Sequence, residues 1–246
     1  LVRYRTHSGK IGCMIGPEQQ RRAYLQAMGI DVWLPRDADD AASGESPGAA
    51  QTDDGFATGA PPADWDELRA CVTECTRCAL AGSRTNTVFG VGNPDADWMI
   101  IGEAPGAEED RRGEPFVGRA GKLLDQMLLA IGQSREKVFI ANILKCRPPN
   151  NRDPKPDEAA ACRDYLEQQI ALVRPKIVLA VGRIAAQNLL GSDEPVGRMR
   201  GRPHELDGIP LVVTYHPAYL LRSPSQKRKS WSDLCLARRL AAENGA

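Results

Sequence analysis

The chain has 246 residues, of which 42% are hydrophobic, and its formal net charge at pH 7 is zero. This length allows one full hydrophobic core, and no apolar run approaches the ~20 residues of a membrane-spanning helix, so a cytoplasmic protein without membrane contact is expected. The charges are unevenly distributed along the chain: residues 37–63 hold six acids and no base, whereas residues 183–239 hold ten bases and five acids. The C-terminal part is therefore the better candidate for binding an anionic partner, although such a surplus is more often a solvated face.

The first 63 residues are expected to lie outside the main domain. Residues 1–36 are assigned to an N-terminal extension, in which residues 18–34 have the apolar spacing of a short helix followed by an extended run. The first 13 residues precede Met14 and are given no structural weight. Residues 37–63 are rich in Ala, Gly, Ser, Pro and Asp, and because this composition cannot offset the entropy lost on ordering, a disordered acidic linker is predicted.

From residue 64 onward, segments with strand periodicity alternate with segments of helical periodicity. Strands are predicted at residues 97–102, 138–144, 176–181 and 209–214. Helices are predicted at residues 65–71, 120–131, 156–173, 182–190 and 231–242. Strands and helices that alternate in this way predict an α/β domain over residues 64–246, three-layer α/β/α with a central four-stranded parallel sheet.

A glycine- and acid-rich loop, residues 101–121, follows the first predicted strand. In an α/β protein such a loop lies at the carboxyl edge of the sheet, where ligands bind. Its crowded charges are compatible with a simple solvated cluster, but Phe116 stands in the middle of this polar stretch. Phe116 either anchors the loop on the core or offers a stacking face to a planar ring.

Three polar residues, Glu103, Asn142 and His216, stand at or near the ends of predicted strands. Because the carboxyl ends of parallel strands meet at one edge of a sheet, these side chains can face one crevice. A single Asn in an apolar strand more commonly bonds a neighbouring loop, yet a buried amide also offers the donor and acceptor that a nucleobase edge requires. His216 directly precedes Pro217 and follows a strand, so it is better placed for function than the other two histidines.

Four of the seven cysteines have a spacing that indicates a metal site. Cys75 and Cys78 form a CTRC pair, and Cys146 and Cys162 follow with fifteen residues between them. Four thiolates hold either a tetrahedral zinc ion or a [4Fe-4S] cluster, and the wide second spacing favours the cluster by a small margin. The other three cysteines fit no such pattern and are expected to be buried as small apolar residues: Cys13, Cys71 and Cys235.

Four motifs stand in order along the chain: GEAPGAEED (residues 102–110), GEPFVGRAG (113–121), NILKCRPPNNR (142–152) and VTYHPAYLLR (213–222). They resemble the successive motifs of the family 4 uracil-DNA glycosylases, the iron-sulfur branch of that superfamily. The likeness covers about residues 71–240 and does not extend to the N-terminal extension or the linker. Since that family binds its cluster through four cysteines, the resemblance implies a [4Fe-4S] cofactor on four residues: Cys75, Cys78, Cys146 and Cys162.

The resemblance also implies an activity, namely flipping uracil out of DNA and hydrolysing its N-glycosidic bond to leave an abasic site, which starts base-excision repair. No lysine nucleophile is required, so a monofunctional enzyme without strand cleavage is expected. Carried over onto this chain, the family pattern implies that Phe116 stacks on uracil, Asn142 bonds its N3 and O4 edge, and His216 faces O2. Glu103 is implied as the carboxylate beside the sugar, so Glu103 and His216 are the candidate catalytic residues.

The remaining residues implied by the resemblance line the pocket or contact DNA. Gly102 and Ala104 would line the pocket together with Glu103, and either Glu109 or its neighbour Glu108 would crowd C5, where thymine carries its methyl group. Contacts inside the DNA helix would come from three consecutive residues: Leu220, Leu221 and Arg222.

Two other hypotheses are weighed against this one. A branch of the superfamily that captures uracil-DNA covalently needs an extra histidine after the second strand, and residues 147–161 contain none. A non-catalytic iron-sulfur or zinc module that only binds DNA predicts equal affinity for DNA with and without uracil. The expected partner is uracil-containing DNA, with activity on single strands left open, and the expected state is a monomer.

Overall fold

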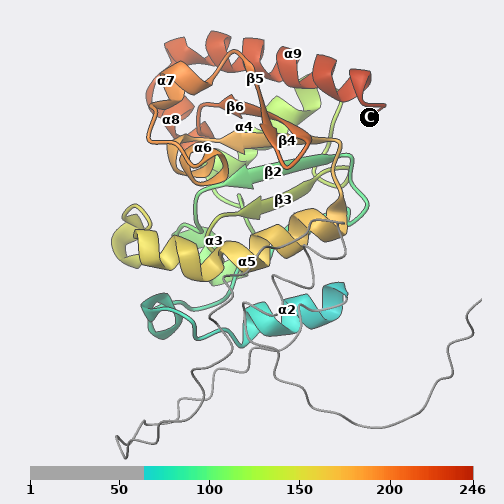
Figure 1. Ribbon diagram of the computed structural model, residues 1–246. Coiled ribbons are helices and arrows are strands. Elements are labelled where there is room, and N and C mark those ends of the chain that lie inside the picture. The colour runs from blue at the N-terminus through green and yellow to red at the C-terminus, as the bar shows by residue number, and fades with distance from the viewer. Residues whose placement is uncertain (1–63, 246) are drawn as a thin grey trace, which may run out of the picture. The chain divides into compact units, whose positions relative to one another are not determined.

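The computed structural model describes residues 64–245, and the predicted extension, linker and Cys13 lie outside the described residues. A six-stranded sheet forms the centre, in the order β1-β3-β2-β4-β6-β5 (Figure 1). Its strands are β1 Val91–Gly92, β2 Trp98–Gly102, β3 Phe139–Asn142, β4 Ile177–Val181, β5 Pro203–Leu206 and β6 Ile209–Thr214. The four central strands run parallel, and the two edge strands pair antiparallel with their neighbours.

Helices cover both faces of this sheet (Figure 1). Helices α2, α5 and α6 share a core with one face, and helices α4, α8 and α9 share a second core with the other. The helix bounds are α2 Trp65–Thr73, α3 Ala107–Arg112, α4 Arg119–Ala130, α5 Pro156–Val173, α6 Arg183–Leu190, α7 Val196–Met199, α8 Pro217–Arg222 and α9 Lys227–Glu243. Short 3₁₀ turns lie at Ala79–Gly82, Pro149–Asn151 and Pro224–Gln226. No helix within residues 64–245 is long and apolar enough to cross a membrane.

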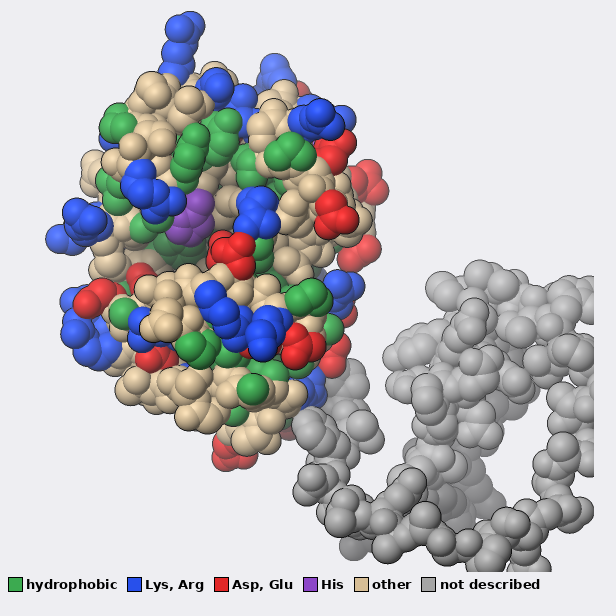
Figure 2. All heavy atoms as spheres, turned by 90° about the vertical axis from the view of Figure 1, so that its left-hand side faces the viewer, with side chains coloured by type: hydrophobic (Ala, Val, Ile, Leu, Met, Phe, Trp, Pro, Cys, Tyr) green, Lys and Arg blue, Asp and Glu red, His purple; other side chains and the backbone are tan. Residues whose placement is uncertain are grey.

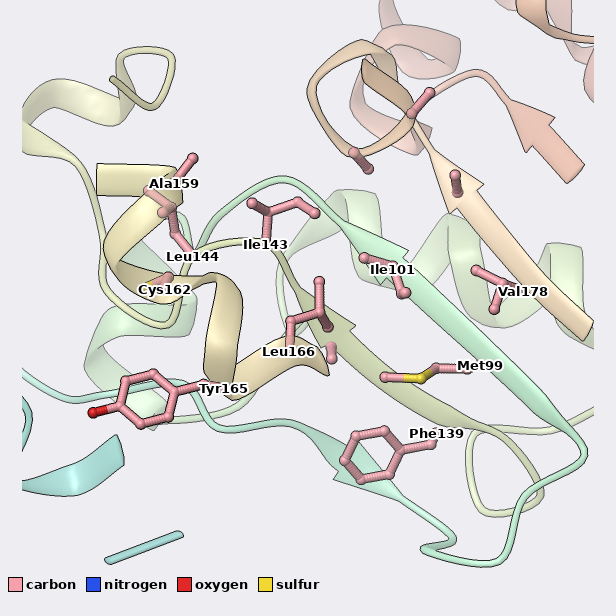
Figure 3. Close-up of a cluster of buried hydrophobic side chains, with 14 of the residues drawn as sticks. Met99, Ile101, Phe139, Ile143, Leu144, Ala159, Cys162, Tyr165, Leu166 and Val178 are labelled. Carbon is pink, nitrogen blue, oxygen red and sulfur yellow. The ribbon is translucent and has the colours of Figure 1, made fainter. Parts of the chain in front are cut away.

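The two cores follow from the alternation of side chains along the strands. In β2, Met99 and Ile101 point into the core with α2, α5 and α6, while Trp98 and Ile100 point into the core with α4, α8 and α9. Figure 3 shows part of the first core, where side chains of β2, β3 and α5 meet. Because both faces are covered, β2 is buried at every position and reads as a continuous apolar run.

The predicted three-layer order and the four parallel strands are confirmed, and two edge strands are added to them. Strand β1 has only two residues, and β5 alternates between exposed and half-buried residues, so neither carries the apolar pattern of a buried strand. Helix α9 begins at Lys227 rather than at the predicted Trp231, because its first turn is charged and shows no apolar spacing.

The prediction that the unassigned cysteines are buried is wrong for Cys71, which is exposed. Helix α2 buries Leu68 and Val72, so Cys71 lies on its outer side. Cys235 on α9 is half-buried. The exposure of a cysteine outside the motif therefore depends on the helix face on which it lies, and the residue type alone does not predict that face.

The register of the sheet brings the ends of the parallel strands to one edge. Gly102 at the end of β2 pairs with Asn142 at the end of β3, and Val181 of β4 pairs with Thr214 of β6. The residues that follow these pairs leave the sheet on the same side. Polar side chains from segments far apart in the sequence therefore converge there.

Candidate active site

The loop after β2 is held in shape by one carboxylate, that of Glu109 on α3. Its Oε2 accepts a hydrogen bond from the backbone N–H of Gly106 at 3.1 Å, and its Oε1 accepts from the N–H groups of Val117 and Gly118 at 3.0 and 3.1 Å. Bonds of this charge-assisted kind are stronger than neutral ones, so they close the loop on itself. Glu109 also lines the pocket described below, whereas Glu108 forms a surface ion pair outside it.

Phe116 is a buried aromatic wall in this loop. Its φ of 55° is uncommon for a bulky residue, and Arg135 holds the backbone there by donating to the carbonyl oxygens of Phe116, at 3.2 Å, and Pro115. Gly121 passes so close that a Cβ on it would lie 1.6 Å from the Phe116 carbonyl oxygen. The Phe116 ring stacks toward the His216 imidazole, with 5.6 Å between ring centroids and 29° between planes.

Asn142, the last residue of β3, is buried with one amide atom unpaired. Only 2% of the residue is exposed, and its Oδ1 has no hydrogen-bond partner. A Cβ on the paired Gly102 would lie 2.4 Å from Asn142 Oδ1 and 2.6 Å from Phe116 Cζ, so glycine leaves the space between amide and ring open. A buried acceptor without a donor costs about 1–3 kcal/mol. The free Oδ1 therefore points to a ligand that donates a hydrogen bond at this place.

His216 follows β6 and begins helix α8. Its Nδ1 accepts a hydrogen bond from the backbone N–H of Ala218 at 3.1 Å, which places the proton of the neutral ring on Nε2. The pKa of His216 is lowered to about 4, mainly by burial and also by the Arg222 cation, against the opposing effect of the Glu109 carboxylate. At neutral pH the imidazole is therefore an uncharged donor that offers Nε2–H to a ligand.

Glu103 follows β2 at the same edge. The pKa of Glu103 is raised to about 7, mainly by burial and also by the Asp153 carboxylate, against the opposing effect of the Arg183 guanidinium. Arg183 and Asp153 form an ion pair with each other. A carboxyl group with such a pKa is about half ionised at neutral pH and is suited to accept a proton from water.

These side chains line one pocket of about 780 Å³. The predicted residues that line it are Glu103, Ala104, Glu109, Phe116, Asn142, His216 and Arg222. Gly102 does not line it but keeps the space between Asn142 and Phe116 free. Figure 2 looks onto this edge of the sheet and shows a hollow bordered by Lys and Arg side chains. The volume falls in the range of small-ligand sites.

Sequence reasoning missed several lining residues, among them Asn151, Arg183, Tyr215 and Tyr219. Arg183 comes two residues after the end of β4, so the rule that singled out the other strand ends could also have found it. Asn151 sits in a turn with a positive φ of 53°, and no local pattern brings that turn to the pocket.

The three residues predicted to enter the DNA helix separate in the structure. Leu220 is 1% exposed and packs in the core with α4 and α9, whereas Leu221 is 41% exposed and Arg222 lines the pocket. Neighbouring residues of a helix point in different directions, so one of two adjacent leucines must face inward. Leu221 and Arg222 are thus the members of this set that lie at the surface.

The four motif cysteines come together from three segments. Cys146 and Cys162 are buried, and Cys75 and Cys78 are half-buried. Burial raises the pKa of the Cys146 thiol, and the nearby Cys75 and Cys78 thiols raise it further. The pKa of Cys162 is raised to about 11, mainly by burial, while Lys145 lowers it and the Cys146 and Cys78 thiols raise it. Arg84 opposes this at Cys146, where it donates to Sγ at 3.2 Å.

Four thiols are a donor set that suits a tetrahedral zinc ion or an iron-sulfur cluster. Within residues 64–245 no three His, Cys, Asp or Glu side chains come close enough to hold one metal ion. Tetrahedral zinc, with Zn–S bonds of about 2.3 Å, needs its sulfurs within about 4 Å of one another. A four-iron cage takes its thiolates at more widely spaced corners, and Cys146 lies within electrostatic reach of the other three motif thiols.

Comparisons with known proteins show the family to which the chain belongs. The Uracil DNA glycosylase superfamily matches residues 89–237. A type-4 uracil-DNA glycosylase of Archaeoglobus fulgidus is 44% identical over 176 residues, which are 68% of this chain and 88% of that protein. A type-4 uracil-DNA glycosylase of Thermotoga maritima is 46% identical over 168 residues, 66% of this chain and 88% of that protein. A type-4 uracil-DNA glycosylase of Saccharolobus solfataricus is 47% identical over 168 residues, which are 65% of this chain and 76% of that protein. The chain belongs to the type-4 uracil-DNA glycosylases.

Proposed function

We propose that this protein is a monofunctional DNA glycosylase that flips uracil out of DNA and hydrolyses the bond between uracil N1 and C1′ of the sugar. The observation that carries the proposal is the buried, unpaired Oδ1 of Asn142, which faces a pocket walled by an aromatic ring and a neutral histidine. Uracil has an N–H between two carbonyl groups, so its edge supplies the missing donor.

Recognition is assigned to Asn142 and Phe116. The N3–H of uracil donates to Asn142 Oδ1, and Asn142 Nδ2 donates to O4. Cytosine has an unprotonated N3 and an amino group at that edge, so both amide atoms would meet the wrong partner, and such buried mismatches give strong rejection. Phe116 provides a face on which the flipped base stacks. Glu109 supports this wall and, as the acid that lines the pocket, is the better candidate than Glu108 to crowd C5.

Bond breaking is assigned to His216 and Glu103. When the bond breaks, its electron pair goes to uracil N1, and the anion is spread to O2, which accepts a hydrogen bond from His216 Nε2–H. The preorganised donor is held by the bond from Ala218 N–H to Nδ1. Ionised Glu103 stabilises the positive charge on the sugar and takes the proton from the water that attacks C1′. Leu221 and Arg222 occupy the space beside the vacated base.

We propose a [4Fe-4S] cluster on Cys75, Cys78, Cys146 and Cys162. Such a cluster cross-links segments and is able to carry an electron. Arg84 ties two of these segments by donating to the Cys75 carbonyl oxygen at 2.7 Å and to Cys146 Sγ. A brown preparation with about four irons per chain supports the assignment, and a colourless one with zinc refutes it. The monomeric state and the cytosolic location expected from the sequence stay predictions.

The function is tested by base release from oligonucleotides that carry uracil opposite guanine, uracil opposite adenine or uracil in a single strand. The wild-type chain should release uracil from at least one of them, and Asn142→Ala should lose most of that activity. Absence of release, combined with equal affinity for DNA with and without uracil, would establish the non-catalytic DNA-binding module instead.

A further inference from the structure

Lys145 is a fully buried lysine that the proposed chemistry does not use. It is 1% exposed and lies between Asn142 and the motif cysteine Cys146 in the chain. An ammonium group in the interior is costly unless hydrogen bonds satisfy it. Lys145 Nζ donates to the backbone carbonyl oxygen of Asn142 at 2.9 Å and to Gln169 Oε1 at 2.6 Å. Gln169 is itself fully buried and donates from Nε2 to the Phe89 carbonyl oxygen at 2.8 Å.

These bonds fix one peptide unit from both sides. The carbonyl oxygen of Asn142 is held by Lys145, and the N–H of the next residue, Ile143, donates to the Gly102 carbonyl oxygen at 2.9 Å. Because a peptide unit is planar, holding both of its polar atoms sets its orientation and thereby the direction in which the Asn142 side chain leaves the backbone. The side chain needs this support, since no protein donor holds its Oδ1.

The same network reaches the helix that carries a motif cysteine. Gln169 stands on α5, two turns after Cys162, and both residues face the sheet side of that helix. Figure 3 shows Ile143 and Leu144, which directly precede Lys145 in the chain, next to α5 near Cys162. The end of β3 is thus connected to α5 by a side chain as well as by the chain itself.

We propose that Lys145 is a positioning residue that aims the Asn142 amide at the base and, through Gln169, couples that aim to helix α5. This inference rests on the proposed function, because it assumes that Asn142 reads the base. A misplacement of about 1 Å in a group that orients substrate lowers rates by about 100-fold. Replacement of Lys145 should therefore slow base release although Lys145 touches neither base nor sugar.

The decisive experiment is a double-mutant cycle with Lys145→Met and Asn142→Ala in the full chain. Single-turnover rates of uracil release and affinities for a uracil oligonucleotide are measured with enzyme in excess. Lys145→Met should lower the rate by about 100-fold, and adding it to Asn142→Ala should lower the rate no further. Multiplying effects in the double mutant would overturn the inference. If the wild-type chain releases no uracil, the proposed function itself has failed, which is a different result.

Two variants of Gln169 provide a matched pair that spares Lys145. Gln169→Glu keeps an acceptor for Lys145, and Gln169→Leu removes it, while both lose the bond to the Phe89 carbonyl oxygen. The inference requires Gln169→Glu to release uracil faster than Gln169→Leu, and equal rates would refute it. This pair decides the question if Lys145→Met fails to fold or loses its iron. Leu211→Ala, which opens a cavity at a buried position within β6, should lower the melting temperature without slowing release.

Discussion

The pH dependence of uracil release should respond in opposite directions to Asp153→Asn and Arg183→Gln. The two side chains pair with each other beside Glu103, where the carboxylate of Asp153 raises the pKa of Glu103 and the guanidinium of Arg183 lowers it. Removing Asp153 leaves the cation unopposed, so the pKa of Glu103 should fall. Removing Arg183 leaves the anion unopposed, so the pKa should rise above its wild-type value.

The magnitude follows from the pKa of Glu103, which is about 7 because burial and Asp153 together outweigh Arg183. Glu103 acts in its ionised form, so the rate should climb with pH and level off above that value. At about one pH unit below the midpoint only about a tenth of the carboxyl groups are ionised, and the rate should be about tenfold below its plateau. His216, with a pKa of about 4, stays neutral over this range and adds no second limb.

The assay is single-turnover release of uracil over about pH 5 to pH 9, with the midpoint as readout rather than the plateau. Burial also lowers the pKa of Lys145 to about 7, so the wild-type pH profile alone does not show whether Glu103 or Lys145 causes the rise in rate. Asp153 and Arg183 are among the charges that shift Glu103 and not among those that shift Lys145, so a moved midpoint assigns the limb to Glu103. Unchanged midpoints in both variants, or a limb that persists in Glu103→Gln, would refute the role of Glu103 as the base.

Three further predictions concern the pocket and the cysteine site. His216→Ala should remove about 3–4 kcal/mol of transition-state stabilisation and so slow uracil release by a factor of about 100 to 1,000, with little change in DNA affinity. A release rate within tenfold of wild type would contradict the role of His216 as the donor to O2. Gly102→Ala should block the site, since its Cβ would lie 2.4 Å from Asn142 Oδ1, and unimpaired release by a folded variant would show that the pocket is read elsewhere. Arg84→Ala should lose iron faster to a chelator than wild type, because the bonds to the Cys75 carbonyl and to Cys146 Sγ disappear; equal rates of colour loss would remove Arg84 from the cluster's support.

Several site residues could be predicted because their signal is local. Glu103, Asn142 and His216 are polar residues next to apolar strands, and parallel strands place their carboxyl ends at one edge of the sheet. Leu220 shows the limit of this reasoning. Its motif position suggested contact with DNA, but the helical turn directs it into the core and leaves Leu221 outside. Adjacent residues of one motif therefore differ in exposure because their side chains point in different directions from the helix.

The sequence by itself determined the order of strands and helices, the four-stranded parallel core and the motifs that carry the family likeness. These properties depend on apolar spacing and residue type over short windows. The tertiary structure alone decided that Asn142 Oδ1 is left unpaired, that Asp153 and Arg183 stand beside Glu103, and that Lys145 holds the Asn142 peptide. The first two depend on strand order, register and loop path. The third depends on the burial of Lys145 against Gln169 of α5, and a local pattern contains none of this.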